Sequence, residues 1–133
     1  MTNAEKIVEF QNAMGGEAPA EPTLPTAKLL ELRRTLIREE SAEVDEAFDR
    51  LAAENSAEAL AHLMHECADL LYVAYGAMVS MGADADAVFA EIHRANMQKA
   101  NGPRRADGKV LKPKDFVPAD VFGVMYGVGL PKS

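Results

Sequence analysis

Two pairs of acidic residues stand at helical spacing in segments that are otherwise largely apolar. Glu40 and Glu43 lie three residues apart in LIREESAEVDEA, and Glu66 and Asp69 lie three residues apart in HLMHECADLLYV. Residues i and i+3 share one face of a helix, so each pair presents two carboxylates to the same side. An oxygen-only cluster of this kind suits a hard cation, Mg²⁺ first and Mn²⁺ as a substitute.

The acids occupy positions where a helix usually carries apolar side chains. With ~100° per residue, Glu43 falls near ~240° and Glu40 near ~300° from Ile37, in the same arc as Leu36. Glu39 falls near ~200°, at the edge of that arc. Because a buried carboxylate is costly unless it is paired or metal-bound, two inward pairs on consecutive helices favour a metal site. Surface acids, or acids paired with nearby arginines, are the alternative interpretation.

A basic segment follows the acids. Six of the 14 Lys and Arg residues fall between positions 99 and 114, where only Asp107 opposes them: Lys99, Arg104, Arg105, Lys109, Lys112 and Lys114. A polyphosphate needs its charge neutralised, and a metal ion with Lys and Arg side chains does this. A solvated tail or a subunit-contact segment is the alternative for this stretch.

Other chemically active residues are weaker candidates. His62 and His65 flank Glu66, and we expect a surface or hydrogen-bonding role for them, with His65 turned away from the face of Asp69. Cys67 is the single cysteine, which rules out an internal disulfide and suits a reducing cytoplasm. The chain has no Gly-x4-Gly-Lys phosphate-binding loop.

The elements that must position these residues are helices. Apolar spacing predicts helices over 1–14, 26–54, 55–81 and 84–100, and the Gly-rich stretch 119–126 allows a short one. Expected N-caps are Thr2 or Asn3, Thr26, Asn55 with Glu58 as a capping box, and Asp84 or Asp86. No strand of period two is apparent, so the predicted fold class is all-α, an antiparallel helix bundle.

The helix over 55–81 is apolar nearly all round, which predicts a central, buried position. Leu30, Ile37, Val44 and Leu51 recur every seven residues and predict a packing seam. We expect one domain over residues 1–133: an N-terminal helix and linker (1–25), catalytic helices (26–100), and a basic loop with a C-terminal tail (101–133).

Composition narrows the classes of partner. The chain has 133 residues and a net charge of -7, which argues against general binding of nucleic acid or anionic membranes. No apolar run reaches the ~20 residues of a membrane span. Residues 1–10 lack the apolar core of a signal peptide, so we expect a cytoplasmic protein.

The acid motif resembles that of the all-α nucleoside triphosphate pyrophosphatases, which include MazG-like proteins, dimeric dUTPases and phosphoribosyl-ATP pyrophosphohydrolase. Their signature is Glu-Glu-x-x-Glu, a spacer, then Glu-x-x-Asp. Here it is Glu39-Glu40-Ser-Ala-Glu43 and, after residues 44–65, Glu66-Cys-Ala-Asp69. Asn96-Met-Gln-Lys99 and Arg105-Ala-Asp-Gly-Lys109 resemble the basic part of MazG-like and phosphoribosyl-ATP enzymes. The chain is similar in particular to the small MazG-like proteins of Deinococcus.

The resemblance implies a hydrolase of nucleoside triphosphates that releases pyrophosphate, with dUTP as substrate. It implies that Glu40, Glu43, Glu66 and Asp69 hold Mg²⁺, and that Glu39 lies near the attacking water as a ligand or base. Residues implied to face the phosphates are Asn96, Lys99, Arg105 and Lys109. The family also implies a homodimer, in which the four-helix core forms between chains.

Three other functions stay open from the sequence. The same chemistry could act on deoxynucleoside triphosphates broadly, or on phosphoribosyl-ATP. A di-iron helical bundle would need Glu-x-x-His pairs, but Glu43 and Asp69 stand where histidine is required. A non-catalytic interaction module could use the heptad seam, although inward acids argue against it.

Overall fold

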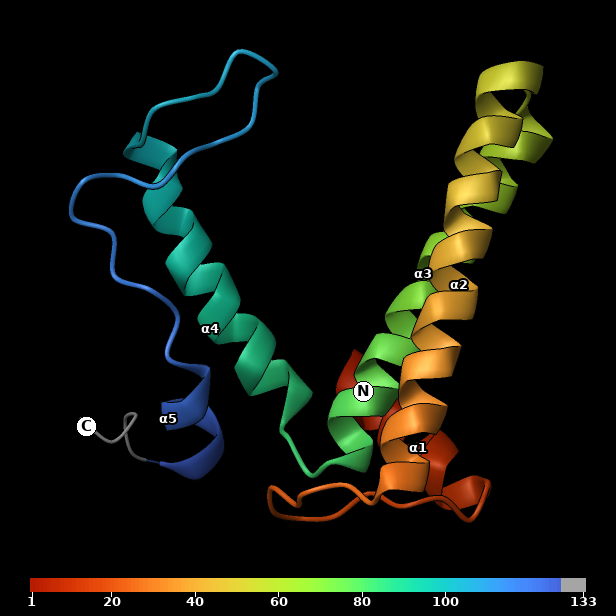
Figure 1. Ribbon diagram of the computed structural model, residues 1–133, viewed down its shortest axis with the longest axis vertical. Coiled ribbons are helices and arrows are strands. Elements are labelled where there is room, and N and C mark those ends of the chain that lie inside the picture. The colour runs from red at the N-terminus through yellow and green to blue at the C-terminus, as the bar shows by residue number, and fades with distance from the viewer. Residues whose placement is uncertain (128–133) are drawn as a thin grey trace. The chain divides into compact units, whose positions relative to one another are not determined.

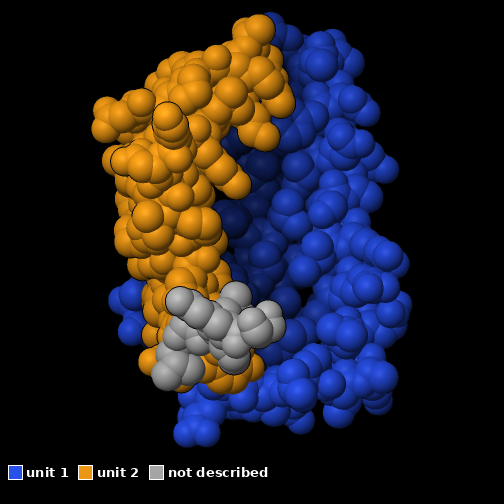
Figure 2. Space-filling model, turned by 60° about the vertical axis from the view of Figure 1, so that its left-hand side comes forward, with its two compact units in different colours: residues 1–82 blue, residues 83–133 orange. Residues whose placement is uncertain are grey.

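The computed structural model describes residues 1–127, in which the regular secondary structure is helical and no strand is present. The elements are α1 (Asn3–Ala13), α2 (Ala27–Glu54), α3 (Ala57–Ser80), α4 (Ala85–Met97), the 3-10 turn η1 (Gln98–Asn101) and α5 (Val121–Tyr126). The all-α prediction is confirmed. The chain forms two compact units, Met1–Gly82 and Ala83–Ser133, which are coloured separately in Figure 2.

The first unit consists of α1, α2 and α3. The two long helices, α2 and α3, run antiparallel side by side, and the shorter α1 packs against α3 (Figure 1). Asn55 and Ser56 make the whole connection between α2 and α3. Such a short connection fixes which levels of the two helices face each other.

Polar caps define where the helices begin. Thr2 caps α1 through a reciprocal capping box with Glu5, and Thr26 accepts a hydrogen bond from the Leu29 amide. The prediction that Asn55 opens α3 was wrong, because Ser56 is its N-cap and Asn55 ends α2 in the left-handed region at φ 46°. Asparagine tolerates that conformation better than most residues, which is why it can stand between two helices.

Burial in this unit is concentrated in small side chains. Ala47 is 1% exposed and Ala59 is 0% exposed, so α2 and α3 can approach closely. The prediction that α3 is buried on all sides does not hold within the single chain, where its large exposed residues are Leu60, Met64, Leu71 and Tyr72. One long neighbour and the short α1 cannot cover every side of a 24-residue helix.

The predicted heptad seam on α2 is only partly buried. Ile37, Val44 and Leu51 are half-buried, while Leu30 is exposed. None of the described helices is both long and apolar enough to cross a membrane.

The second unit contains α4, η1, the basic loop and α5. Asp84 caps α4 as predicted, through a hydrogen bond from the Ala87 amide. Polar side chains of α4 and η1 hold the segment before α5. Gln98 pairs with both backbone groups of Val117, at 2.8 and 2.9 Å, and Glu91 accepts from the Asp120 amide at 3.0 Å.

Glu91 also pairs with Arg94, at 2.8 Å between Oε1 and Nη2. Hydrogen bonds from the Arg94 side chain and the Asp120 amide lower the pKa of Glu91 to about 2 from an ordinary value of 4.5. A depressed carboxyl pKa means that the folded state favours the ionised form. This carboxylate therefore ties residues 118–120 to α4.

The Glu91 network predicts a specific acid dependence of folding stability. Above pH 4.5 the ionised Glu91 stabilises the folded state, and this contribution is lost as pH falls from 4.5 through 2. Chemical unfolding at several pH values should show Glu91→Gln less stable than the parent at pH 7, with the difference shrinking across that window. Glu9→Gln, at an exposed acid of α1, is the control. A pH-independent difference for Glu91→Gln would contradict the assignment.

Candidate metal centre

Three carboxylates from α2 and α3 converge in the first unit. One oxygen each from Glu40, Glu43 and Glu66 lies within 4.8 Å of the other two. A second group of potential ligands, with the same spacing, consists of His65, Glu66 and Asp69. Glu66 belongs to both groups, so all four predicted metal ligands lie in one connected cluster, which we call the acid cluster: Glu40, Glu43, Glu66 and Asp69.

The antiparallel pairing of α2 and α3 explains this convergence. The step from Glu40 to Glu43 runs along α2 in the direction opposite to the step from Glu66 to Asp69 along α3. Each step is three residues, so each helix brings both carboxylates to the shared face at neighbouring levels. Glu39 is exposed and belongs to neither group of potential ligands.

The cluster contains buried oxygens without partners. Within residues 1–127, Glu40 Oε2 and Glu66 Oε2 are buried and have no hydrogen-bond partner. The pKa of each carboxyl is raised, first by burial and then by Glu43, through hydrogen bonding and through its charge. Asp69 and Glu66 raise the pKa of Glu40 further, while His62 and His65 partly offset the rise at Glu66.

Two histidines on α3 contact the acids. His65 Nε2 lies 3.0 Å from Asp69 Oδ2, and His62 Nε2 lies 3.7 Å from Glu66 Oε1. The expectation that His65 is turned away from Asp69 was wrong, because residues i and i+4 are only ~40° apart around a helix. The hydrogen-bonding role expected for the histidines stays a prediction, and His65 also belongs to a group of potential metal ligands.

The acid cluster fits a divalent metal ion. Two of its oxygens, Glu40 Oε2 and Glu66 Oε2, are buried and unpaired, its carboxylates repel one another, and a cation would relieve both conditions. Carboxylate oxygens are the ligands that Mg²⁺ and Mn²⁺ prefer, whereas zinc sites usually recruit Cys or several His.

The second unit contains a basic pocket of about 460 Å³ around the end of α4. Three of the predicted phosphate-binding residues line it: Asn96, Lys99 and Lys109. Arg104 lines it as well, whereas Arg105 does not. Arg105 instead makes two hydrogen bonds to Asp107, the longer at 2.9 Å, and these raise the pKa of its guanidinium.

Arg104 was predicted as part of the basic segment but not as a phosphate-binding residue. Its position in the pocket depends on a turn around Gly108 that pairs the Arg104 and Val110 backbones in an isolated bridge. The Arg105 amide also bonds to the Lys109 carbonyl across this turn. Sequence spacing alone does not distinguish which of two adjacent arginines such a turn directs inward.

Comparison with known families gives one match. The family described as phosphoribosyl-ATP pyrophosphohydrolase matches residues 7–96, which are 90 of the 133 residues. This range contains the whole acid cluster and Asn96, and it ends before the other basic-pocket residues. A search of curated proteins gave no significant match.

The acid cluster predicts how pH and metal affect stability. Because the folded-state pKa values of Glu40 and Glu66 are raised, protonation favours the folded state, and metal-free protein should become more stable as pH falls from 7 toward 4.5. Glu66→Gln should be more stable than the parent at pH 7 without metal, and should show less of this pH response.

Mg²⁺ should stabilise the parent more than Glu66→Gln, which is the reverse of the order expected without metal. Mg²⁺ at 100 times its Kd should stabilise the parent by about 2.7 kcal/mol through mass action, and Glu66→Gln much less. Thermal unfolding with and without Mg²⁺ measures both effects. Glu46→Gln, at an exposed acid of α2, is the matched control and should behave as the parent. Equal metal stabilisation of Glu66→Gln and the parent would remove Glu66 from the site.

Proposed function

The chain belongs to the phosphoribosyl-ATP pyrophosphohydrolase family, within the MazG-like all-α nucleoside triphosphate pyrophosphatases, and we propose that it hydrolyses a nucleoside triphosphate to the monophosphate and pyrophosphate. Family membership makes it a hydrolase of phosphoric anhydride bonds, and MazG-like pyrophosphohydrolases are generally dependent on a divalent metal. The observation that carries the proposal is the pair of buried, unpaired oxygens of Glu40 and Glu66 beside Glu43.

In the proposed reaction, the acid cluster binds the metal ion and Glu39 acts as the general base. Mg²⁺, when bound by Glu40, Glu43, Glu66 and Asp69, supplies positive charge that acidifies water and stabilises phosphoryl oxygens. The exposed carboxylate of Glu39 accepts the proton that the attacking water loses. The water oxygen bonds to the α-phosphorus as the bond from that phosphorus to the α,β-bridging oxygen breaks. Pyrophosphate leaves with the bridging oxygen and the electron pair of the broken bond.

The basic pocket is proposed to bind the phosphates. Lys99, Arg104 and Lys109 supply positive charge, and the Asn96 amide supplies neutral donors. Arg105, which the resemblance places at the phosphates, has Asp107 as its partner and supports the shape of the loop.

We propose dUTP as the substrate, because the sequence as a whole resembles the small MazG-like proteins of Deinococcus, for which the expected activity is dUTP hydrolysis. The family description favours phosphoribosyl-ATP as a second candidate, and deoxynucleoside triphosphates in general are a third. All three share the triphosphate that the acid cluster and basic pocket suit, so the nucleoside part must decide between them.

We also propose that the protein works as a homodimer in the cytoplasm. The support for a dimer is the row of large apolar side chains left exposed on one side of α3, which consists of Leu60, Met64 and Leu71. Leu32 and Phe48 are exposed on α2 as well. Exposed apolar patches of this kind are typical of protein interfaces, and a second copy would complete a four-helix core.

A pyrophosphate-release assay tests the reaction. With Mg²⁺, dUTP should give dUMP and pyrophosphate without orthophosphate, and faster than the four standard deoxynucleoside triphosphates or phosphoribosyl-ATP. Glu66→Gln should lose at least about 100-fold in kcat/KM, since even outer-shell partners of a metal site are worth ~10–100-fold. Glu46→Gln should keep parental activity. Full activity in excess chelator would refute the metal mechanism, and equal rates on all substrates would refute only the dUTP preference.

Substitutions in the basic loop test the phosphate pocket. Lys99→Ala and Arg104→Ala should each lower kcat/KM by roughly 10- to 100-fold, as expected for losing a charged hydrogen bond. Neither should change the stabilisation by Mg²⁺. Arg105→Ala should cost less, because Asp107 already engages its guanidinium. Lys28→Ala, at an exposed lysine of α2, is the control. Parental kcat/KM in both Lys99→Ala and Arg104→Ala would make the loop a solvated tail.

A further inference from the structure

A cavity of about 250 Å³ lies in the first unit, where α1 meets α2 and α3. Its walls are mostly apolar and aromatic, and its polar side chains are those of Arg33, Gln11 and Tyr72. Its lining includes Ile7, Phe10, Gln11, Arg33, Tyr72 and Gly76. The rings of Phe10 and Tyr72 meet edge to face, with centroids 5.4 Å apart. We call this space the Arg33 cavity.

Arg33 is the unusual member of this lining. Its Nε is buried and has no hydrogen-bond partner among residues 1–127, and burial lowers the pKa of the guanidinium. A buried cationic donor without an acceptor is unfavourable, so such a group is expected to meet an oxygen in a complex.

Gly76 makes room for the guanidinium on α3. A Cβ atom at this position would stand 2.8 Å from Arg33 Nη1, closer than real Cβ contacts allow. Glycine in a helix interior is less favourable than alanine, so the position has a packing reason. The arginine is therefore held against the backbone of α3 at this level.

The cavity lies on the face of the helices that carries the acid cluster. Arg33 precedes Glu40 by seven residues, which is ~20° around α2 and ~10.5 Å along it. Gly76 follows Asp69 by the same seven residues on α3. Because the helices are antiparallel, both steps run in one direction, and they lead from the acid cluster to the Arg33 cavity.

We propose that the Arg33 cavity binds the base of the nucleotide substrate, and that Arg33 Nε donates a hydrogen bond to a carbonyl oxygen on that base. The inference rests on the proposed function, because it assumes that the triphosphate lies at the acid cluster. The hydrogen bond from Arg33 would favour bases that carry a ring carbonyl, such as uracil, over adenine, which has none.

The lining chemistry favours a base over a phosphate in this place. Aromatic and aliphatic walls suit a planar ring, whereas a phosphate would leave most of its oxygens without donors. Gln11 adds an amide that can both donate and accept, and among residues 1–127 its side chain makes only a long 3.4 Å bond to the Glu17 carbonyl.

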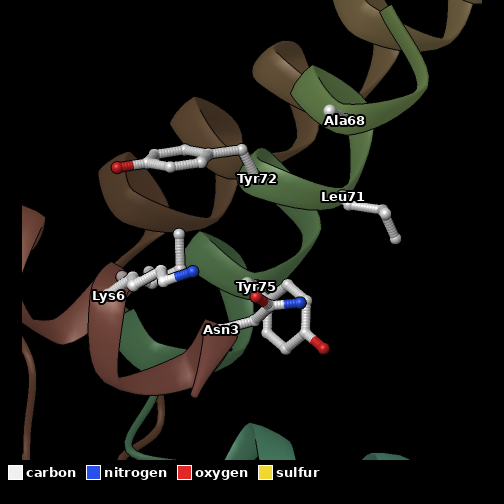
Figure 3. A pocket seen from close by; sticks show the side chains of 7 residues that line it. Asn3, Lys6, Ala68, Leu71, Tyr72 and Tyr75 are labelled. Atoms are coloured by element: carbon white, nitrogen blue, oxygen red, sulfur yellow. The ribbon is translucent and has the colours of Figure 1, made fainter. Parts of the chain in front are cut away.

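A neighbouring pocket of about 190 Å³ does not lie on the helix face that carries the acid cluster. Figure 3 shows that α1 contributes Asn3 and Lys6 to it, while α3 contributes Ala68, Leu71, Tyr72 and Tyr75. Ala68, Leu71 and Tyr75 lie ~140–200° around α3 from Glu66, so this pocket opens on the side opposite the acids.

Binding of dUMP and dAMP, measured by calorimetry with Mg²⁺ on the full chain, tests the proposal without requiring turnover. Arg33→Met keeps the apolar stem and removes the donor. It should weaken dUMP binding by roughly 10- to 100-fold, the size of one hydrogen bond to a charged group, and dAMP binding much less. Arg34→Met changes the adjacent, exposed arginine of α2 and should leave both affinities unchanged.

Gly76→Ala is a second variant, which displaces the guanidinium without removing it, and it should also weaken dUMP selectively. Mg²⁺-induced stabilisation should be retained in both variants.

A parent that binds dUMP selectively through Arg33 but hydrolyses no triphosphate would refute the proposed function and leave this inference standing. Equal losses for dUMP and dAMP, parental dUMP affinity in both variants, or no dUMP binding by the parent would overturn it.

Discussion

Mutual repulsion among the carboxylates of the acid cluster, between α2 and α3, is the constraint on which the rest of the first unit depends. Glu40, Glu43 and Glu66 come within 4.8 Å of one another, and burial deprives two of them of water. Isolated side chains would move apart. Two long helices with polar caps at Thr26 and Ser56 and a two-residue connection resist that movement, because each carboxylate is attached to a helix of six or more turns.

The same constraint shapes the packing of the first unit. Close approach of the helices requires small side chains between them, and Ala47 and Ala59 provide it with almost no exposed surface. The larger apolar residues then lie on the outer sides, as Leu60 and Met64 do on α3. These exposed apolar side chains are the feature that supports the proposed dimer.

Much of this arrangement could be predicted from the sequence because its signals are local. Helical periodicity and caps located the helices, and i, i+3 spacing placed both acid pairs on shared faces. Contacts set by tertiary structure could not be predicted in this way. The αL turn at Asn55 depends on how α2 meets α3, and the choice of Arg104 over Arg105 depends on a loop turn. The His65–Asp69 contact was predictable, since i, i+4 geometry requires no tertiary information.

Arg33 and the acids together account for the unusual polarity between α2 and α3. In the part of the chain that the structure describes, three buried side-chain polar atoms lack a partner: Glu40 Oε2, Glu66 Oε2 and Arg33 Nε. Native proteins leave few such atoms, and all three lie on facing sides of α2 and α3. Two are acceptors that require a cation, and one is a donor that requires an oxygen. A metal ion bound to a nucleotide with a ring carbonyl supplies both, so one ligand would satisfy all three atoms.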